Sequence, residues 1–209
     1  MLESLKPAFN NLLRPLVRPL AAIGLHPNHL TLAGLALFCV AAWFVFKGQW
    51  MVALVLVIAG SLLDGLDGVV ARETGKKSVF GAILDSSCDR LTEIFLIAGV
   101  LGYLLTMPLI SFSKPGITLN LRAWGIVYCY GAITMSLMVS YVKARCEGAG
   151  VPCNRGIMQR PERLILLCIG LLIGPRVMIY ILGGLSILGA ITVVERIFQA
   201  CTGSKNKQP

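Results

Sequence analysis

The stretch Trp50–Ala71, WMVALVLVIAGSLLDGLDGVVA, joins a long apolar run to two aspartates, Asp64 and Asp67. A transmembrane helix needs about 20 predominantly apolar residues, and this stretch has that length. An aspartate at the centre of a membrane helix costs about 2.5–3.5 kcal/mol on insertion scales, so acids retained there indicate a function. The stretch therefore predicts a membrane helix whose carboxylates need a compensating partner.

The composition of the whole chain agrees with this prediction. Of the 209 residues, 56% are hydrophobic and 14% are charged, and the mean hydropathy is +0.77. Soluble globular domains carry about 25% charged residues, so a soluble enzyme and a disordered chain are both excluded. The sequence predicts an all-α, polytopic membrane protein with six transmembrane helices. The predicted spans are Leu30–Phe46, Trp50–Ala71, Phe80–Met107, Ala123–Val142, Gln159–Gly174 and Val177–Phe198.

Residues 1–29 have a different pattern. Apolar residues alternate with basic ones at helical spacing, and several prolines interrupt any continuous helix. The pattern predicts an N-terminal amphipathic segment that lies in the membrane interface and does not span it. We expect one membrane domain over residues 1–209, made of this segment, a six-helix bundle over 30–198 and a cytoplasmic tail over 199–209.

The distribution of basic residues predicts the orientation. The chain has 19 Lys and Arg against 10 Asp and Glu, a net charge of +9. In a membrane protein this charge is expected in cytoplasmic loops and against anionic headgroups, so no nucleic-acid partner is predicted. With the N-terminus inside, the outside loops hold only Lys47, Lys114, Arg122 and Arg176. The inside segments hold Lys6, Arg14, Arg18, Arg72, Lys76, Lys77, Lys143, Arg145, Arg155, Arg160, Arg163, Arg196, Lys205 and Lys207. We expect a multi-pass protein of the cytoplasmic membrane with both termini and the active site on the cytoplasmic side.

Acidic residues gather in the second and third predicted spans. Asp64 and Asp67 share one helical face, and Asp85 and Asp89 are four residues apart on the next helix. A short basic turn between the two helices would bring these faces together, and four carboxylates repel one another unless cations neutralise them. Oxygen ligands at this density suit Mg²⁺ or Mn²⁺, and a pair of such ions indicates phosphoryl chemistry. Two alternatives remain at this point: a cation or proton transporter that uses the same aspartates, and structural pairing with arginine or lysine.

Two glycines favour the enzyme over these alternatives. Gly68 and Gly81 each weaken a helix by up to about 1 kcal/mol relative to alanine. A close approach of the backbone to a ligand would explain both.

Residues 64–89 carry a specific signature. They read DGLDGVVAR, then eight residues, then GAILDSSCD. This stretch resembles the signature D-x-x-D-G-x-x-A-R-x8-G-x3-D-x3-D of the CDP-alcohol phosphotransferases, with every fixed position filled. The resemblance implies a six-span membrane enzyme, commonly a homodimer, that transfers the phosphatidyl group of CDP-diacylglycerol to an alcohol and releases CMP.

The resemblance also implies roles for individual residues. It makes Asp64, Asp67, Asp85 and Asp89 the ligands of two divalent cations, and Asp89 also the general base. The segment His26–Thr31 resembles the family's entry to the first span. Together with the signature, it implies that CDP is bound by Asn28, Thr31, Gly68, Ala71, Arg72 and Gly81.

The acceptor is expected to be recognised by residues outside the signature. The segments LDSSCDR (84–90), YVKARCEG (141–148) and QRPERLI (159–165) are similar to those of phosphatidylinositol phosphate synthases. This likeness implies inositol 1-phosphate as the acceptor. Glycerol 3-phosphate, the acceptor of phosphatidylglycerophosphate synthases, is the alternative. Guanidinium groups suit an acceptor phosphate, and the implied residues are Lys143, Arg145, Arg160, Arg163 and Arg196.

Overall fold

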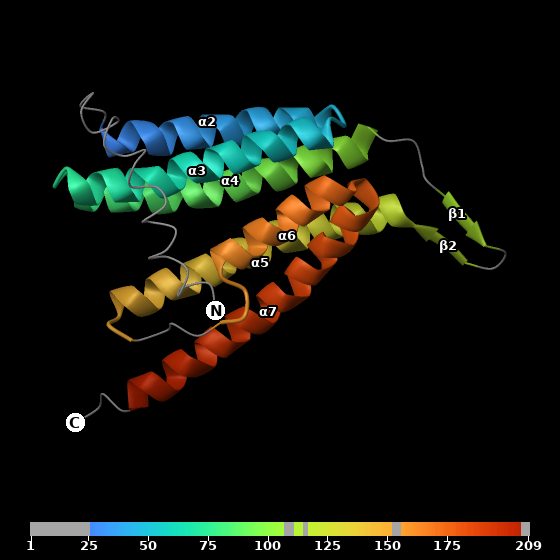
Figure 1. Cartoon of the computed structure of the whole chain (residues 1–209). Helices are drawn as coiled ribbons and strands as arrows, with labels where there is room; N and C mark the ends of the chain where they lie inside the picture. Colours follow the sequence, from blue (N-terminus) through green and yellow to red (C-terminus); the bar gives the residue numbers. More distant parts are fainter. Residues whose placement is uncertain (1–25, 107–110, 115–116, 152–155, 206–209) are drawn as a thin grey trace. The chain divides into compact units, whose positions relative to one another are not determined.

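The computed structural model describes residues 26–106, 111–114, 117–151 and 156–205. The predicted interfacial segment lies almost wholly outside the described residues, as do Arg155 and the end of the tail. The described helices are α2 (Pro27–Phe46), α3 (Trp50–Glu73), α4 (Val79–Thr106), α5 (Leu121–Gly148), α6 (Arg160–Ile173) and α7 (Pro175–Lys205) (Figure 1). Each of them corresponds to one of the six predicted apolar runs.

Four of these helices are long and apolar enough to cross a membrane: α2, α3, α5 and the Pro175–Thr202 part of α7. The protein is therefore an integral membrane protein. The other two helices, α4 and α6, do not meet this criterion, for different reasons. Helix α4 carries charged side chains through its N-terminal half. Helix α6 has 14 residues, which give a length of about 21 Å at 1.5 Å per residue.

One element departs from the all-α expectation. Between α4 and α5, strands β1 (Ser111–Lys114) and β2 (Ile117–Asn120) pair antiparallel, with Ser111 opposite Asn120. The sequence predicts only a loop here, although Pro115-Gly116 between the strands is a dipeptide typical of turns. Strand pairing satisfies the backbone N–H and C=O groups that a loop would leave to solvent.

The chain forms two compact units, one ending at Leu96 and the other beginning at Ile97. In the first unit, α2 packs on α3 at a crossing of two glycines. A Cβ atom on Gly34 would lie 3.2 Å from the carbonyl oxygen of Gly60, and a Cβ on Gly60 would lie 2.9 Å from the ring of Phe38. Small residues let membrane helices approach this closely, because backbone can pack directly on backbone.

The second unit is held together by α7, which packs against both α5 and α6. Glycines alternate between α5 and α7 along the contact of these helices, and each glycine packs against a larger side chain of the other helix. The pairs are Gly125 with Ile179, Gly183 with Tyr128, Gly131 with Ser186 and Gly189 with Met135. The Ser186 hydroxyl lies 3.2 Å from the Tyr128 carbonyl oxygen, to which it donates a hydrogen bond. These glycine contacts and the hydrogen bond hold α5 and α7 together along their N-terminal halves.

Candidate functional site

The candidate site lies at one end of the first unit, where α2 begins, α3 ends and α4 begins. His26 caps α2 by accepting a hydrogen bond from the Asn28 N–H at 3.3 Å, and Pro27 occupies the first turn. A proline in the first turn loses no helical hydrogen bond, so α2 begins at Pro27, three residues before the predicted Leu30. This places Asn28 and Thr31 inside the helix, on the turn closest to the site.

The turn between α3 and α4 is short and well capped. Thr74 ends α3, and Gly75 then adopts a φ of 68°, a left-handed conformation that glycine tolerates best. Ser78 caps α4 through its hydroxyl, which accepts from the Gly81 N–H at 2.9 Å. Because the turn is short, the start of α4 lies next to the end of α3.

Three of the four predicted aspartates come together there. One carboxylate oxygen from each of Asp64, Asp67 and Asp85 lies within 4.8 Å of the other two. Asp67 is buried, with 5% of its surface exposed, and its Oδ2 accepts a hydrogen bond from the Thr31 hydroxyl. Asp64 and Asp85 are half-buried. Asp89 lies one turn further along α4, outside this group of three.

The donor set fits a hard divalent cation. Three carboxylates at this separation repel one another, and oxygen ligands are those that Mg²⁺ and Mn²⁺ take. Mg²⁺ keeps several waters and is held by one or two carboxylates together with substrate phosphates, so three converging carboxylates are sufficient. The residues present therefore fit the predicted metal site.

The two signature glycines have different surroundings. A Cβ atom on Gly68 would meet only the Arg72 guanidinium, at 4.0 Å, so the protein leaves this position open. A Cβ on Gly81 would lie 3.0 Å from the Ser78 hydroxyl and 3.3 Å from the Asn28 amide oxygen. Of the six predicted CDP-binding residues, Asn28 and Gly81 are thus neighbours across the starts of α2 and α4. Arg72 extends along α3 beside Gly68.

Ala71 is the remaining predicted CDP-binding residue of α3. It is half-buried one turn after Gly68, and Arg72 is exposed in the last turn of α3. An arginine at a helix C-terminus is favoured by the helix dipole. The open position at Gly68 and the exposed cation beside it form a surface suited to a phosphate group.

The predicted acceptor residues lie in the second unit and fall into two kinds. Arg163 and Arg196 are buried, with 4% and 3% of their surfaces exposed. Arg163 donates to the Met158 carbonyl oxygen at 3.3 Å and Arg196 to that of Val139 at 2.6 Å. Each hydrogen bond uses one nitrogen of a guanidinium that carries five N–H donors.

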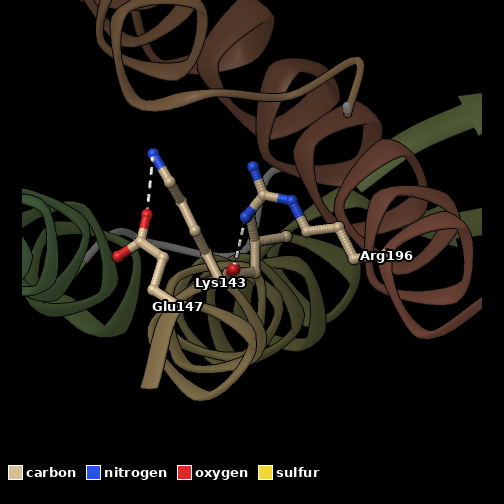
Figure 2. A network of polar contacts seen from close by, with 4 residues as sticks. Lys143, Glu147 and Arg196 are labelled. Atoms are coloured by element: carbon tan, nitrogen blue, oxygen red, sulfur yellow. Dashed lines mark hydrogen bonds and ion pairs between the residues drawn. The ribbon is translucent and has the colours of Figure 1, made fainter. Parts of the chain in front are cut away.

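The others are more accessible. Lys143 pairs with Glu147 at 3.8 Å along α5, Arg145 is exposed and Arg160 is half-buried. Val139 and Lys143 are one helical turn apart, so Arg196 reaches the α5 face that carries Lys143 (Figure 2). The structure thus brings Lys143 and Arg196 to one face of α5.

Two contacts in this unit are not foreseen from the sequence. Thr192 of α7 accepts a hydrogen bond from the Met158 N–H at 3.3 Å, and Gly156 packs against Thr192 and Arg196. The apolar run Val177–Phe198 does not show which of its hydroxyl groups contacts a neighbouring segment. Only the spacing of Thr192 four residues before Arg196, which puts both on one face, was an available signal.

Comparison with known proteins identifies the family. The CDP-alcohol phosphatidyltransferase family model matches residues 24–197. The chain belongs to this family. The resemblance predicted from residues 64–89 is confirmed, and the protein is a transferase.

Two similar relatives carry the names of synthases of inositol phosphate lipids. An archaetidylinositol phosphate synthase of Pyrococcus horikoshii is 31% identical over 203 residues, 96% of each chain. A phosphatidylinositol phosphate synthase of Mycolicibacterium smegmatis is 34% identical over 166 residues, 79% of this chain and 69% of that protein.

Solved structures of the family have the same fold. The Mycobacterium tuberculosis phosphatidylinositol phosphate synthase with CDP-DAG bound matches with a TM-score of 0.78 and 27% identity, over 93% of this chain and 96% of that chain. The same enzyme in complex with manganese and citrate matches with a TM-score of 0.79, over 93% of this chain and 91% of that one.

Proposed function

We propose that the protein transfers the phosphatidyl group of CDP-diacylglycerol to a hydroxyl of inositol 1-phosphate and releases CMP. One observation carries this proposal: a chain with three converging aspartates is similar over most of its length to synthases of inositol phosphate lipids. The reaction would serve phospholipid biosynthesis.

The reaction needs no reactant other than CDP-diacylglycerol and the acceptor. A hydroxyl oxygen of the acceptor forms a bond to the phosphorus that carries the lipid, and the bond from that phosphorus to the oxygen bridging it to CMP breaks. The acceptor proton passes to a base, and CMP leaves with the bridging oxygen. The acceptor hydroxyl and the leaving CMP must therefore be aligned on opposite sides of the phosphorus atom that carries the lipid.

Two divalent cations, Mg²⁺ or Mn²⁺, would be held by Asp64, Asp67, Asp85 and Asp89. When bound, such ions neutralise the diphosphate and stabilise the charge on the leaving group. The support is the chemistry of the three-aspartate group and the manganese complex of the mycobacterial relative.

Asp89 is the proposed general base. It lies outside the close group of Asp64, Asp67 and Asp85. A carboxylate that binds metal tightly is a weak base, because the cation lowers its pKa. A position one helical turn away from that group suits a carboxylate that must also accept a proton.

CDP would lie along the start of α2 and the end of α3. Asn28, Thr31, Gly68, Ala71, Arg72 and Gly81 are the proposed CDP-binding residues. The open position at Gly68 would let the diphosphate approach the α3 backbone, and the Arg72 guanidinium beside it would donate hydrogen bonds to phosphate oxygens.

The phosphate of the acceptor would be bound by Lys143, Arg145, Arg160, Arg163 and Arg196. Buried guanidiniums that are held by hydrogen bonds to carbonyl oxygens suit a phosphate better than solvated ones, because they lose less entropy on binding. Arg163 and Arg196 have this character, and Lys143 supplies a further positive charge on the same face of α5 as Arg196.

The proposed topology has six spans, with α4 and α6 completing the four apolar helices, and an interfacial segment before α2. Arg72, Lys76 and Lys77 lie at the aspartate end of the first unit. By the positive-inside rule, that end and both termini face the cytoplasm. The enzyme would act as a homodimer in the cytoplasmic membrane.

An acceptor panel tests the proposed function. Purified protein in detergent, supplied with Mn²⁺ and CDP-diacylglycerol, is given inositol 1-phosphate, glycerol 3-phosphate, inositol or serine, and CMP is measured. We expect CMP release that depends on inositol 1-phosphate. Release with glycerol 3-phosphate alone would assign the alternative acceptor, and release with no acceptor would refute the transfer. A parallel arm with a CDP-activated ether lipid tests whether the donor is of the archaeal type.

A further inference from the structure

A compact network of buried groups surrounds the peptide of Met158, just before α6. The Met158 N–H donates to the Thr192 hydroxyl oxygen at 3.3 Å, and its carbonyl oxygen accepts from Arg163 at 3.3 Å. Both polar groups of one residue are thus held by side chains, one from α7 and one from α6. Neither Met158 nor Thr192 is exposed to solvent, and the surface of Thr192 is 0% accessible.

Thr192 serves two partners at once. Its hydroxyl donates to the Leu188 carbonyl oxygen at 2.8 Å and accepts from Met158. The first bond fixes the direction of the hydroxyl, so a lone pair points towards the segment before α6. The side chain is therefore oriented by its own helix for an interhelical contact.

The second arginine belongs to the same network. Arg196 follows Thr192 by one turn of α7, and Gly156 packs against both. A Cβ atom on Gly156 would lie 2.8 Å from the Thr192 methyl carbon and 3.2 Å from Arg196 Nε. Gly156 thus packs against the Arg196 guanidinium, while Arg196 Nη1 donates to the Val139 carbonyl oxygen of α5.

We infer that Thr192 is a positioning residue whose hydroxyl fixes the orientation of the buried Arg163 for an acceptor phosphate. It acts on Arg163 through the Met158 peptide, whose two polar groups bind Thr192 and Arg163. Its methyl group contacts Gly156, which places Arg196 beside the same network. This inference rests on the proposed function, in which those arginines bind the phosphate. Phosphate recognition by guanidinium depends on the angles of its N–H groups, so a small rotation weakens binding.

The test compares Thr192→Val with Thr192→Ser. Valine keeps the shape and removes the hydroxyl, whereas serine keeps the hydroxyl. We expect Thr192→Val to raise the KM for inositol 1-phosphate about 3- to 10-fold, the range of one lost hydrogen bond, with kcat and the KM for CDP-diacylglycerol within twofold. We expect Thr192→Ser to restore the acceptor KM to within twofold of wild type.

A matched control separates positioning from a general effect on helices. Thr134 makes the same type of bond within a helix, to the Tyr130 carbonyl oxygen at 2.8 Å. Thr134→Val is expected to leave all three kinetic constants within twofold of wild type.

Three results would overturn the inference. They are an unchanged acceptor KM in Thr192→Val, an equal rise in both KM values, and no rescue by serine. If Thr192→Val does not fold, Thr192→Ala decides, since it also removes the hydroxyl that binds the Met158 N–H; an unchanged acceptor KM there refutes the role. Wild-type protein without turnover on inositol 1-phosphate would refute the proposed function instead.

Discussion

Replacing Thr31 with valine removes a buried hydroxyl while nearly keeping the shape of the side chain. That hydroxyl donates to Asp67 Oδ2 and also lies 3.3 Å from the Pro27 carbonyl oxygen. It carries one proton, and the carboxylate is the stronger acceptor because it is charged. In Thr31→Val, Asp67 is free to rotate away from Asp64 and Asp85.

The magnitude follows from the type of bond. A hydrogen bond to a charged group contributes about 1.5–3 kcal/mol. Loss of a partner that orients a metal ligand typically weakens metal binding about 10- to 100-fold. The two ranges agree, because 1.4 kcal/mol corresponds to about a tenfold change in affinity. We therefore expect Thr31→Val to raise the Kd for Mn²⁺ about 10- to 100-fold.

The assay measures metal binding without turnover. Free Mn²⁺ is measured by electron paramagnetic resonance while detergent-solubilised protein is titrated in the absence of nucleotide. Thr31 is also a proposed CDP-binding residue, so omitting the nucleotide isolates its effect on Asp67. Thr31→Ser keeps the donor and is expected to bind Mn²⁺ within threefold of wild type. A Kd in Thr31→Val that is unchanged or lower would refute the orienting role of this hydroxyl.

Five further substitutions separate chemistry from packing. Asp89→Asn is expected to abolish CMP release and to weaken Mn²⁺ binding without abolishing it, since Asp64, Asp67 and Asp85 remain together; complete loss of Mn²⁺ binding would make Asp89 chiefly a ligand. Arg163→Ala leaves a buried carbonyl oxygen without its donor, so thermal unfolding should show a loss of about 1–3 kcal/mol. Lys143→Ala removes an exposed ion pair and should raise the acceptor KM without lowering Tm, whereas a fall in Tm would indicate a structural role. Gly34→Ala forces a Cβ to 3.2 Å from a carbonyl oxygen of α3 and should cost about 1–3 kcal/mol, while Gly184→Ala, which meets nothing within 4 Å, should not lower Tm.

The positions of the helices could be predicted from the sequence because apolar runs of membrane length have few alternatives. Trp50 and Phe46 are helix ends in both the prediction and the structure. Helix ends that lie among polar residues were less predictable. Helix α5 continues to Gly148, past the predicted Val142, because polar residues end a membrane span but do not end a helix. The β1–β2 hairpin was missed because eight residues carry little periodic signal.

The convergence of Asp64, Asp67 and Asp85 could be predicted from helical spacing and a short turn. The position of Asp89 outside this group could not be predicted, because spacing gives the face of a helix but not the distance to the neighbouring helices. Contacts between helices distant in sequence, such as Thr31 with Asp67, depend on which faces pack together. Such contacts require the three-dimensional arrangement of the helices.

The most direct test of the proposed reaction follows the phosphate of the acceptor. Protein with Mn²⁺ and CDP-diacylglycerol is given inositol 1-phosphate labelled with ³²P, and the lipid is extracted into organic solvent. The proposed reaction predicts one labelled phosphate in the lipid for each CMP released, with no transfer in Asp89→Asn. CMP release without label in the lipid, or label that stays in the aqueous phase as free phosphate, would contradict it.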